Sequence, residues 1–176
     1  MFPLRLVRKF GSYAKTYHLS GTGQKTKTIM SHSHLPSPMV MDVPTLMGGE
    51  NTAPQPVEML LAALCGCEQV TAQYVARQMK PRLLIDKIDY DIQATRDQRG
   101  SLTLPIDPDT ELPPSRVERI WGTATIHLPE NATNVPSVET LEVLHSEVRR
   151  RCPVANMVIL SGCKLEIKYV LAASVN

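Results

Sequence analysis

The feature that most constrains the fold is a long helical stretch, residues 56–79, that lies between two prolines. Pro56 suits the first turn of a helix, where its missing amide proton is not needed, and Glu58 complements the positive end of the helix dipole. Pro81 then ends the helix. Residues 57–67 are apolar on nearly every side except at Glu58, so this half of the helix is predicted to lie buried in a core or between subunits.

The rest of the chain alternates between strand and helix patterns. Residues 13–53 are rich in Thr, Ser, Gly and Pro and are predicted to form edge strands or a hairpin. Apolar alternation predicts strands over 83–97, 116–128 and 163–172, and residues 97–115 are predicted to form a loop. Ser137 is predicted to cap a helix whose apolar stripe consists of Val138, Leu141, Leu144 and Val148. A short helix is predicted to begin at Pro153 and end at Gly162. This order predicts an α+β fold, with helices packed on one face of a mostly antiparallel sheet.

Composition excludes several classes of protein. With 176 residues, 43% of them apolar and 20% charged, the chain is the size of one globular domain. No apolar run reaches the roughly 18 residues of a membrane span. A net charge of +2, with only five Tyr, two Phe and one Trp, is too little for a nucleic-acid interface.

The N-terminal segment is basic and has no acidic residue before Asp42. Residues 1–20 therefore have the character of a mitochondrial presequence, and the alternative is a basic strand or arm ahead of a single domain at 21–176. A presequence predicts a mitochondrial protein, and a basic arm predicts a cytoplasmic one. Four cysteines without a secretory signal also favour a reducing compartment.

Two of the cysteines are candidates for redox chemistry. Cys67 lies within the long apolar helix, on a stripe with Leu60, Ala63, Val70 and Tyr74. Taken alone it is as readily a packing residue, because free cysteine is often buried. Cys152 precedes Pro153 at a helix start, where backbone amides favour a thiolate. The arginines at 149–151 would lower its pKa further if one points inward, and otherwise form a solvated helix end.

The other candidates are weaker. Cys65 and Cys67 are about 200° apart around a helix, so they cannot bond to each other or share a metal ion. Cys163, at the start of a strand, is predicted to be structural. The five histidines show no spacing that indicates a catalytic triad.

Two segments resemble the signature motifs of the OsmC/Ohr family of thiol peroxidases. In "GGENTAPQPVEMLLAALCGCEQVTAQYVA" a proline, Pro56, stands eleven positions before Cys67, and in "RRRCPVANM" the pair Cys152-Pro153 opens a helix. The resemblance covers roughly residues 40–172. It implies the OsmC-like fold, with a long central helix, a second helical pair and an intertwined homodimer.

The resemblance also implies a chemistry. Cys67 is expected to be the peroxidatic cysteine, which attacks an organic hydroperoxide and becomes a sulfenic acid, and Cys152 the resolving cysteine, which converts it to a disulfide. A dithiol, such as that of a lipoyl protein, is expected to reduce that disulfide. Neither a metal nor a bound cofactor is expected, nor is a nucleic-acid or membrane partner.

The chain departs from the family pattern at two positions. The hydroperoxide-reducing branches place a glutamate directly after the proline, where this chain has Val57, and the glutamate here is Glu58. At about 1.5 Å per residue Glu58 lies some 13 Å from Cys67 along the helix, on its opposite face, so it could support only a Cys67 of another chain. The family's upstream arginine has no clear match, since the nearby cations in the sequence are Lys15, Lys25, Lys27 and Lys80. Arg151 is a candidate supporting residue. The first motif, "GGENTAPQPVEMLLAAL", resembles the family's less characterised OsmC-like branch more than its efficient peroxidases.

The sequence therefore favours a peroxidase for small organic or lipid hydroperoxides, with apolar side chains such as Leu60, Leu64 and Val70 lining its site. One alternative stays open. The same fold could bind an apolar ligand, or sense oxidants by reversible disulfide formation, without catalysis.

Overall fold

The structure is a computed structural model that describes residues 14–32, 34–130 and 132–173. Contacts within the chain divide it into two compact units, one up to Met59 and the other from Leu60 onward. Residues 1–13, which make up most of the predicted presequence or arm, lie outside the described residues. The presequence, the mitochondrial location and the boundary at residue 21 stay predictions.

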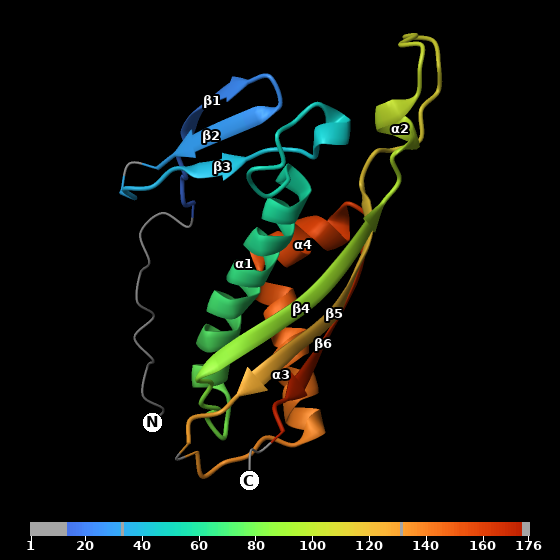
Figure 1. The fold of residues 1–176 in the computed structure, drawn as a ribbon. Coiled ribbons are helices and arrows are strands. Elements are labelled where there is room, and N and C mark those ends of the chain that lie inside the picture. Colours follow the sequence, from blue (N-terminus) through green and yellow to red (C-terminus); the bar gives the residue numbers. More distant parts are fainter. Residues whose placement is uncertain (1–13, 33, 131, 174–176) are drawn as a thin grey trace. The chain divides into compact units, whose positions relative to one another are not determined.

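The first unit contains a three-stranded antiparallel sheet, drawn in blue in Figure 1. Its strands are β1 (Ser20–Gln24), β2 (Lys27–Ser31) and β3 (Met39–Met41), and a short 3-10 helix, η1 (Thr45–Met47), follows. A two-residue turn joins β1 to β2, since Gln24 pairs with Lys27. The hairpin predicted from the Thr- and Gly-rich composition is confirmed.

A buried aspartate holds the loop that follows β3. Asp42 is 1% exposed, and its carboxylate accepts hydrogen bonds from the amides of Val43, Glu50 and Thr52 at 2.8, 3.1 and 3.1 Å. The hydroxyl of Thr52 adds a fourth at 3.0 Å. These bonds, with that from the Thr52 amide the largest, lower the pKa of Asp42 to about 2. The charged carboxylate thus fixes the loop through residues 43–52.

We expect Asp42→Asn to loosen this loop, because an amide presents one acceptor oxygen where the carboxylate presents two. A carboxyl group whose pKa is lower in the folded than in the unfolded state stabilises the fold at any pH above its unfolded pKa, here about 4. This stabilisation is lost as the pH falls towards the folded-state pKa of about 2. Hydrogen exchange of the Glu50 and Thr52 amides should be at least tenfold faster in the variant at pH 7. The wild-type amides should lose protection only between pH 4 and pH 2. Equal protection in both proteins at pH 7 would contradict this role for Asp42.

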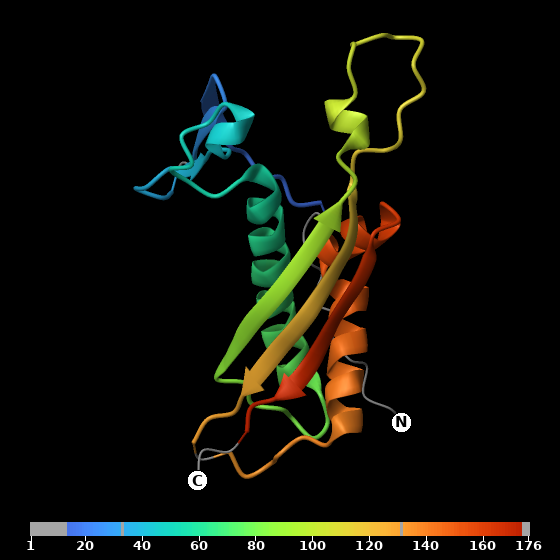
Figure 2. The same ribbon diagram turned by 45° about the vertical axis from the view of Figure 1, so that its right-hand side comes forward.

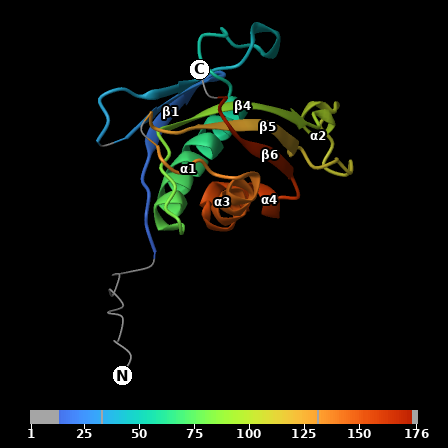
Figure 3. The same cartoon turned by 90° about the horizontal axis from the view of Figure 1, so that it is seen from below.

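The second unit contains a three-stranded sheet in the order β4-β5-β6. Its elements are α1 (Pro56–Gln78, of which the first turn belongs to the first unit), β4 (Lys87–Arg96), α2 (Arg99–Leu102), β5 (Val117–His127), α3 (Val138–Arg151), α4 (Pro153–Leu160) and β6 (Lys164–Leu171). Helices α1, α3 and α4 lie on one face of this sheet, as Figures 1 and 2 show from the side and Figure 3 from below.

The sheet of the second unit is mixed in direction. β4 and β5 are antiparallel, whereas β5 and β6 are parallel. The parallel pairing follows from the connection, since α3 and α4 carry the chain back along the sheet before β6 begins. The predicted α+β fold with helices on one face is confirmed. The sheet was predicted to be mostly antiparallel, and among the described strand pairs only β5 and β6 are parallel.

The core of the second unit lies between the helices and the sheet. α1 buries positions 64, 68, 72 and 75, which share one face of a helix. The buried apolar side chains include Leu64, Ala72, Val75, Ile120, Ala124, Ile126, Leu141, Leu144, Val148 and Ile167. The predicted stripe on α3 is confirmed at three positions and is wrong at Val138, which is 69% exposed.

Two boundaries differ from the sequence pattern. β4 begins at Lys87 rather than residue 83, because the amide of the buried Leu83 donates to the carbonyl of Ala76 at the end of α1, 3.0 Å away. The predicted loop at 97–115 contains the single helical turn of α2. Among the described residues no helix is both long enough and apolar enough to span a membrane.

Candidate functional site: two thiols and a buried polar cluster

Cys152 lies where α3 ends and α4 begins. Its side chain is completely buried. Its sulfur accepts a hydrogen bond from the amide of Ala155 over 3.4 Å, as the N-cap residue ahead of Pro153. The predicted N-cap position of Cys152 is confirmed.

Cys67 lies in the middle of α1 and is half-buried. Its thiol is near enough to Cys152 to form a hydrogen bond with it. Both cysteines are free. The fold thus brings together two thiols that are 85 positions apart in the sequence, while the roles of attacking and resolving cysteine stay predictions.

The environment of Cys152 holds the thiol in its protonated form. Burial raises the pKa of Cys152 to about 11, and the adjacent Cys67 also raises it, whereas hydrogen bonds from the amides of Ala155 and Val154 lower it. The lowered pKa expected at this helix start is therefore wrong. Loss of water around a fully buried sulfur destabilises the thiolate more than the helix amides stabilise it.

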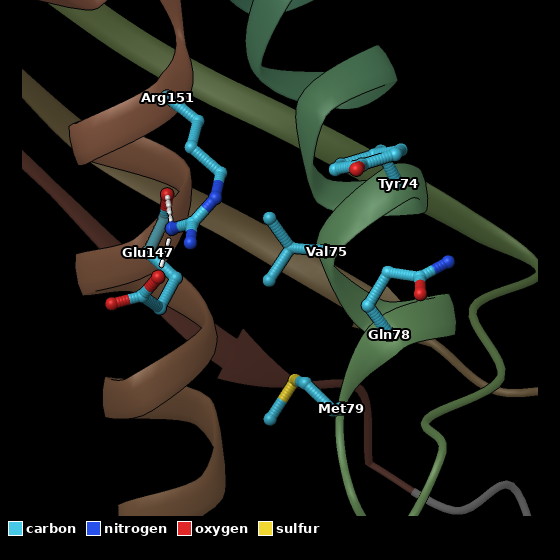
Figure 4. A pocket seen from close by; sticks show the side chains of 6 residues that line it. All are labelled: Tyr74, Val75, Gln78, Met79, Glu147 and Arg151. Carbon is cyan, nitrogen blue, oxygen red and sulfur yellow. Dashed lines mark hydrogen bonds and ion pairs between the residues drawn. The ribbon is translucent and has the colours of Figure 1, made fainter. Parts of the chain in front are cut away.

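The three arginines at the end of α3 have different partners. Arg151 donates to the carbonyl of Glu147 at 3.2 Å and pairs with its carboxylate, and Arg150 pairs with the same carboxylate at 2.7 Å. Figure 4 shows Arg151 and Glu147 on one side of a hollow of about 390 Å³ between α3 and α1. Arg149 instead points inward and donates to the carbonyl of Leu165. The arginine whose charge acts on buried groups is thus Arg149, and the predicted candidate, Arg151, is engaged by Glu147.

Glu58 lies exposed in the first turn of α1. Its carboxylate accepts a hydrogen bond from the amide of Gln55 at 2.7 Å. A glutamate in this position satisfies an amide that the helix start leaves without a partner. Glu58 therefore helps to begin α1, and a role beside Cys67 of another chain stays a prediction.

A buried carboxyl group follows Cys67 directly in the sequence. Glu68 is completely buried, and the hydroxyl of Tyr169 on β6 donates to its Oε2 at 3.3 Å. Its Oε1 has no hydrogen-bond partner among the described residues. Burial raises the pKa of Glu68, and this effect exceeds the opposing influence of the Tyr169 hydroxyl and of the Arg149 charge. Glu68 thus gains and loses its proton at a higher pH than an exposed glutamate.

The register of the sheet places a second tyrosine beside Tyr169. Tyr90 on β4 is opposite Ala124 on β5, and Ala124 is opposite Tyr169 on β6. Paired positions project to the same face of a sheet, and the small Ala124 leaves room for two phenol rings above it. Burial raises the pKa of both tyrosines, and the charge of Glu68 raises each further. The two hydroxyls are also near enough to affect each other.

Residues of α3 and α1 complete this polar cluster. The ring of His145 stacks on that of Tyr169 with 4.8 Å between centroids. Burial lowers the pKa of His145 to about 4, and the charge of Arg149 acts in the same direction, so the imidazole is neutral at pH 7. On α1, burial and the charge of Glu68 raise the pKa of Cys65 to about 11. We call Glu68, Tyr90, Tyr169, His145 and Arg149 the buried polar cluster.

Comparison with known proteins identifies the fold that holds these groups. The family model described as OsmC-like protein matches residues 49–168, which include Cys67, Cys152 and every member of the buried polar cluster except Tyr169. The chain belongs to the OsmC-like protein family. No curated protein matches this OsmC-like chain.

Solved structures share the OsmC-like fold at low sequence identity. An OsmC like protein from Mycoplasma pneumoniae aligns with a TM-score of 0.66 at 20% identity, over 90% of this chain and 99% of that one. An organic hydroperoxide resistance protein OsmC from Legionella pneumophila aligns with a TM-score of 0.61 at 14% identity, over 92% of this chain and 100% of that one. It is also described as a predicted redox protein and regulator of sulfide bond formation. The organic hydroperoxide resistance protein OhrB of Bacillus subtilis aligns with a TM-score of 0.56 at 13% identity, over 90% of this chain and 98% of that one. The OsmC/Ohr resemblance read from the two motifs is confirmed.

Sequence reasoning identified the two thiols of this OsmC-like chain but not the polar cluster around Glu68. One signal for it is present in the sequence, since Glu68 occupies the same helix face as Leu64 and Ala72. The tyrosines and Arg149 could be assigned only from the strand register and the packing of α3. Within 14–32, 34–130 and 132–173 no group of three or more His, Cys, Asp or Glu side chains is arranged to hold a metal ion.

Proposed function

We propose that this OsmC-like protein reduces organic hydroperoxides by means of Cys67 and Cys152. The observation that supports this most is the proximity of the two thiols, one on α1 and the other at the start of α4. Membership of the family and the names of two similar structures, which are hydroperoxide resistance proteins, point in the same direction.

In the proposed reaction the Cys67 thiolate attacks the outer oxygen of the hydroperoxide. The O–O bond breaks, a sulfenic acid forms on Cys67, and the alkoxide takes up a proton and leaves as an alcohol. The Cys152 sulfur then attacks the Cys67 sulfur. An S–S bond forms, the S–O bond breaks, and the hydroxide leaves as water with the proton from Cys152. An external dithiol, such as a lipoyl protein, reduces the disulfide and becomes a disulfide itself.

A single-turnover experiment tests this proposal. Reduced protein is mixed with cumene hydroperoxide or a fatty-acid hydroperoxide, free thiols are counted against time, and the peptides are analysed by mass spectrometry. Loss of two thiols within seconds, with a Cys67–Cys152 crosslink, is the expected result. Retention of all thiols over an hour would overturn the proposal.

One observation favours the non-catalytic alternative. Burial keeps Cys152 protonated, with a pKa of about 11, and a protonated thiol is a weak nucleophile. A protein that forms the crosslink only over hours, with no turnover when a dithiol is added, would be an oxidant sensor or a binder of apolar ligands. The same thiol count distinguishes the two functions.

We also propose that two copies of the chain associate through α1. Leu60, Val70 and Tyr74 lie on the side of α1 that carries Cys67, and they are 42%, 71% and 61% exposed. Leu64, predicted with Leu60 and Val70 to line the substrate site, is buried in the core. An exposed apolar stripe on a helix is typical of a surface that a partner covers.

We expect Val70→Glu to convert a dimer into a monomer, because a charge placed in an apolar interface stays unpaired and unsolvated. Sedimentation equilibrium of the wild-type and variant proteins measures this directly. Val143→Glu, the same change at an exposed valine of α3, is the control and should leave the mass unchanged. A wild-type protein that sediments as a monomer at micromolar concentration would contradict the proposal.

A further inference from the structure

The Cys152 thiol is shielded from bulk solvent. Cys152 is completely buried, and its pKa of about 11 means that it enters the reaction as S–H. The proton must leave the sulfur as the S–S bond forms, and a fully buried group can pass it only to the departing group on Cys67, to another protein group or to an internal water. The amides of Val154 and Ala155 beside the sulfur are donors and cannot accept it.

Tyr90 belongs to the buried polar cluster and also lies near Cys152. The Tyr90 side chain lies within electrostatic range of Cys152, Cys65 and Glu68, and next to the hydroxyl of Tyr169. The Tyr90 hydroxyl is buried and lacks a well-aligned hydrogen bond within the described part of the chain. From Tyr169 a hydrogen bond of 3.3 Å continues to Glu68. Hydroxyl groups both donate and accept, so the Tyr90 hydroxyl, once it turns to bond with Cys152 and Tyr169, can take up one proton and pass on another.

We propose that Glu68 accepts the proton of Cys152 during disulfide formation, through the hydroxyls of Tyr90 and Tyr169. As the Cys152 sulfur bonds to the Cys67 sulfur, its proton moves to the Tyr90 oxygen, the Tyr90 proton to Tyr169, and the Tyr169 proton to the carboxylate of Glu68. The protons return in reverse when the departing hydroxide forms water. This role rests on the proposed function for its reaction, but any step that forms the Cys67–Cys152 disulfide would use it.

The surroundings of Glu68 suit a proton acceptor. Burial raises its pKa, which brings its proton affinity closer to neutral pH than that of an exposed glutamate. The titratable groups that face it are Cys65 on α1, Tyr90 on β4, Tyr169 on β6, and His145 and Arg149 on α3. His145 is neutral, so Arg149 is the cation that stabilises the ionised form. The unpartnered Oε1 of Glu68 leaves the carboxyl free to take a proton.

The variant Glu68→Gln tests the relay, because an amide of the same shape neither gains nor loses a proton near neutral pH. The reduced protein is mixed with diamide, an azo oxidant. The Cys67 thiolate adds to its N=N bond, and the Cys152 thiol then displaces the hydrazine, which leaves both sulfurs oxidised to a disulfide. Stopped-flow spectroscopy and mass spectrometry of quenched samples separate the two steps. We expect the first step to be unchanged and the second to be about 100-fold slower, the lower end of the effect of a positioned acid–base group.

The pH dependence separates proton transfer from a packing defect. In the wild-type protein the second step should become faster as the pH rises through the pKa of Glu68, because only the carboxylate accepts a proton. That rise should be absent in Glu68→Gln. Tyr169→Phe, which interrupts the chain and keeps the carboxyl, should also slow the second step. Glu142→Gln, the same change at an exposed position of α3, should slow neither.

The oxidants distinguish failure of the relay from failure of the proposed function. If the wild-type protein forms the disulfide with diamide but not with hydroperoxides, and Glu68→Gln slows the diamide reaction, then the peroxidase proposal is overturned and the relay stands. If Glu68→Gln and Tyr169→Phe both form the disulfide at the wild-type rate and with the wild-type pH dependence, then the relay is overturned, whatever the result with hydroperoxides.

Discussion

We expect Cys67→Ser to consume no hydroperoxide, and Cys152→Ser to react once and stop as a sulfenic acid on Cys67. The serine hydroxyl at position 67 is not ionised near neutral pH, so the attacking thiolate is lost, and a loss of at least 1,000-fold follows from removing a nucleophile of this kind. At position 152 serine cannot resolve the sulfenic acid. Dimedone, which labels sulfenic acids, and mass spectrometry of the Cys67 peptide measure this outcome.

The cysteine outside the thiol pair provides the control for these variants. Cys163 is buried at the start of β6, and Cys163→Ala should keep both the consumption of hydroperoxide and the Cys67–Cys152 crosslink. Undiminished activity in Cys67→Ser would remove Cys67 from the mechanism. A disulfide that still forms in Cys152→Ser would show that another thiol, such as Cys65, resolves the sulfenic acid.

Gly122→Ala is expected to cause a large loss of stability. Gly122 on β5 has a φ of +145°, a region that side chains rarely adopt, and a Cβ atom there would lie 2.0 Å from the carbonyl oxygen of Asp91. The backbone strain costs roughly 1–3 kcal/mol, and relief of the overlap in a packed sheet costs roughly as much again. Because domains of this size have a free energy of unfolding of about 5–15 kcal/mol, the variant should unfold at much lower urea concentration.

The matched control is the same change at Gly66 in α1. A Cβ atom at Gly66 meets nothing within 4 Å, and alanine favours helix by about 1 kcal/mol over glycine. Gly66→Ala should therefore raise the free energy of unfolding while Gly122→Ala lowers it. Urea titrations followed by circular dichroism measure both, and equal midpoints for Gly122→Ala and the wild type would contradict the proposed strain.

Local patterns in the sequence predicted most of the secondary structure. Pro56 and Pro153 mark the starts of α1 and α4. Ser137 caps α3, since its hydroxyl accepts a hydrogen bond from the amide of Thr140 at 3.3 Å. The strands lie where apolar residues alternate along the sequence. These signals are readable because they act between residues a few positions apart. The first motif also indicated Cys67, and the Cys-Pro pair indicated Cys152.

The pKa of the thiol at Cys152 and the partners of the arginines could not be predicted in this way. Position at a helix start suggested a thiolate, but the pKa depends on the complete burial of the sulfur, which packing of α1 against α4 and the sheet decides. Arg149, Arg150 and Arg151 are consecutive, yet only Arg149 points inward, because a helix turns about 100° at each residue.

The sequence by itself determined the family, the order of the elements and the two cysteines, since each of these depends on local pattern. The tertiary structure decided which groups surround them. Tyr90, Ala124 and Tyr169 lie on three different strands and meet only through the sheet register. Glu68 finds Tyr169, 101 positions away, only when α1 packs on that sheet. Long-range contacts of this kind depend on the whole fold, and they set the proton affinity of every group around the thiols.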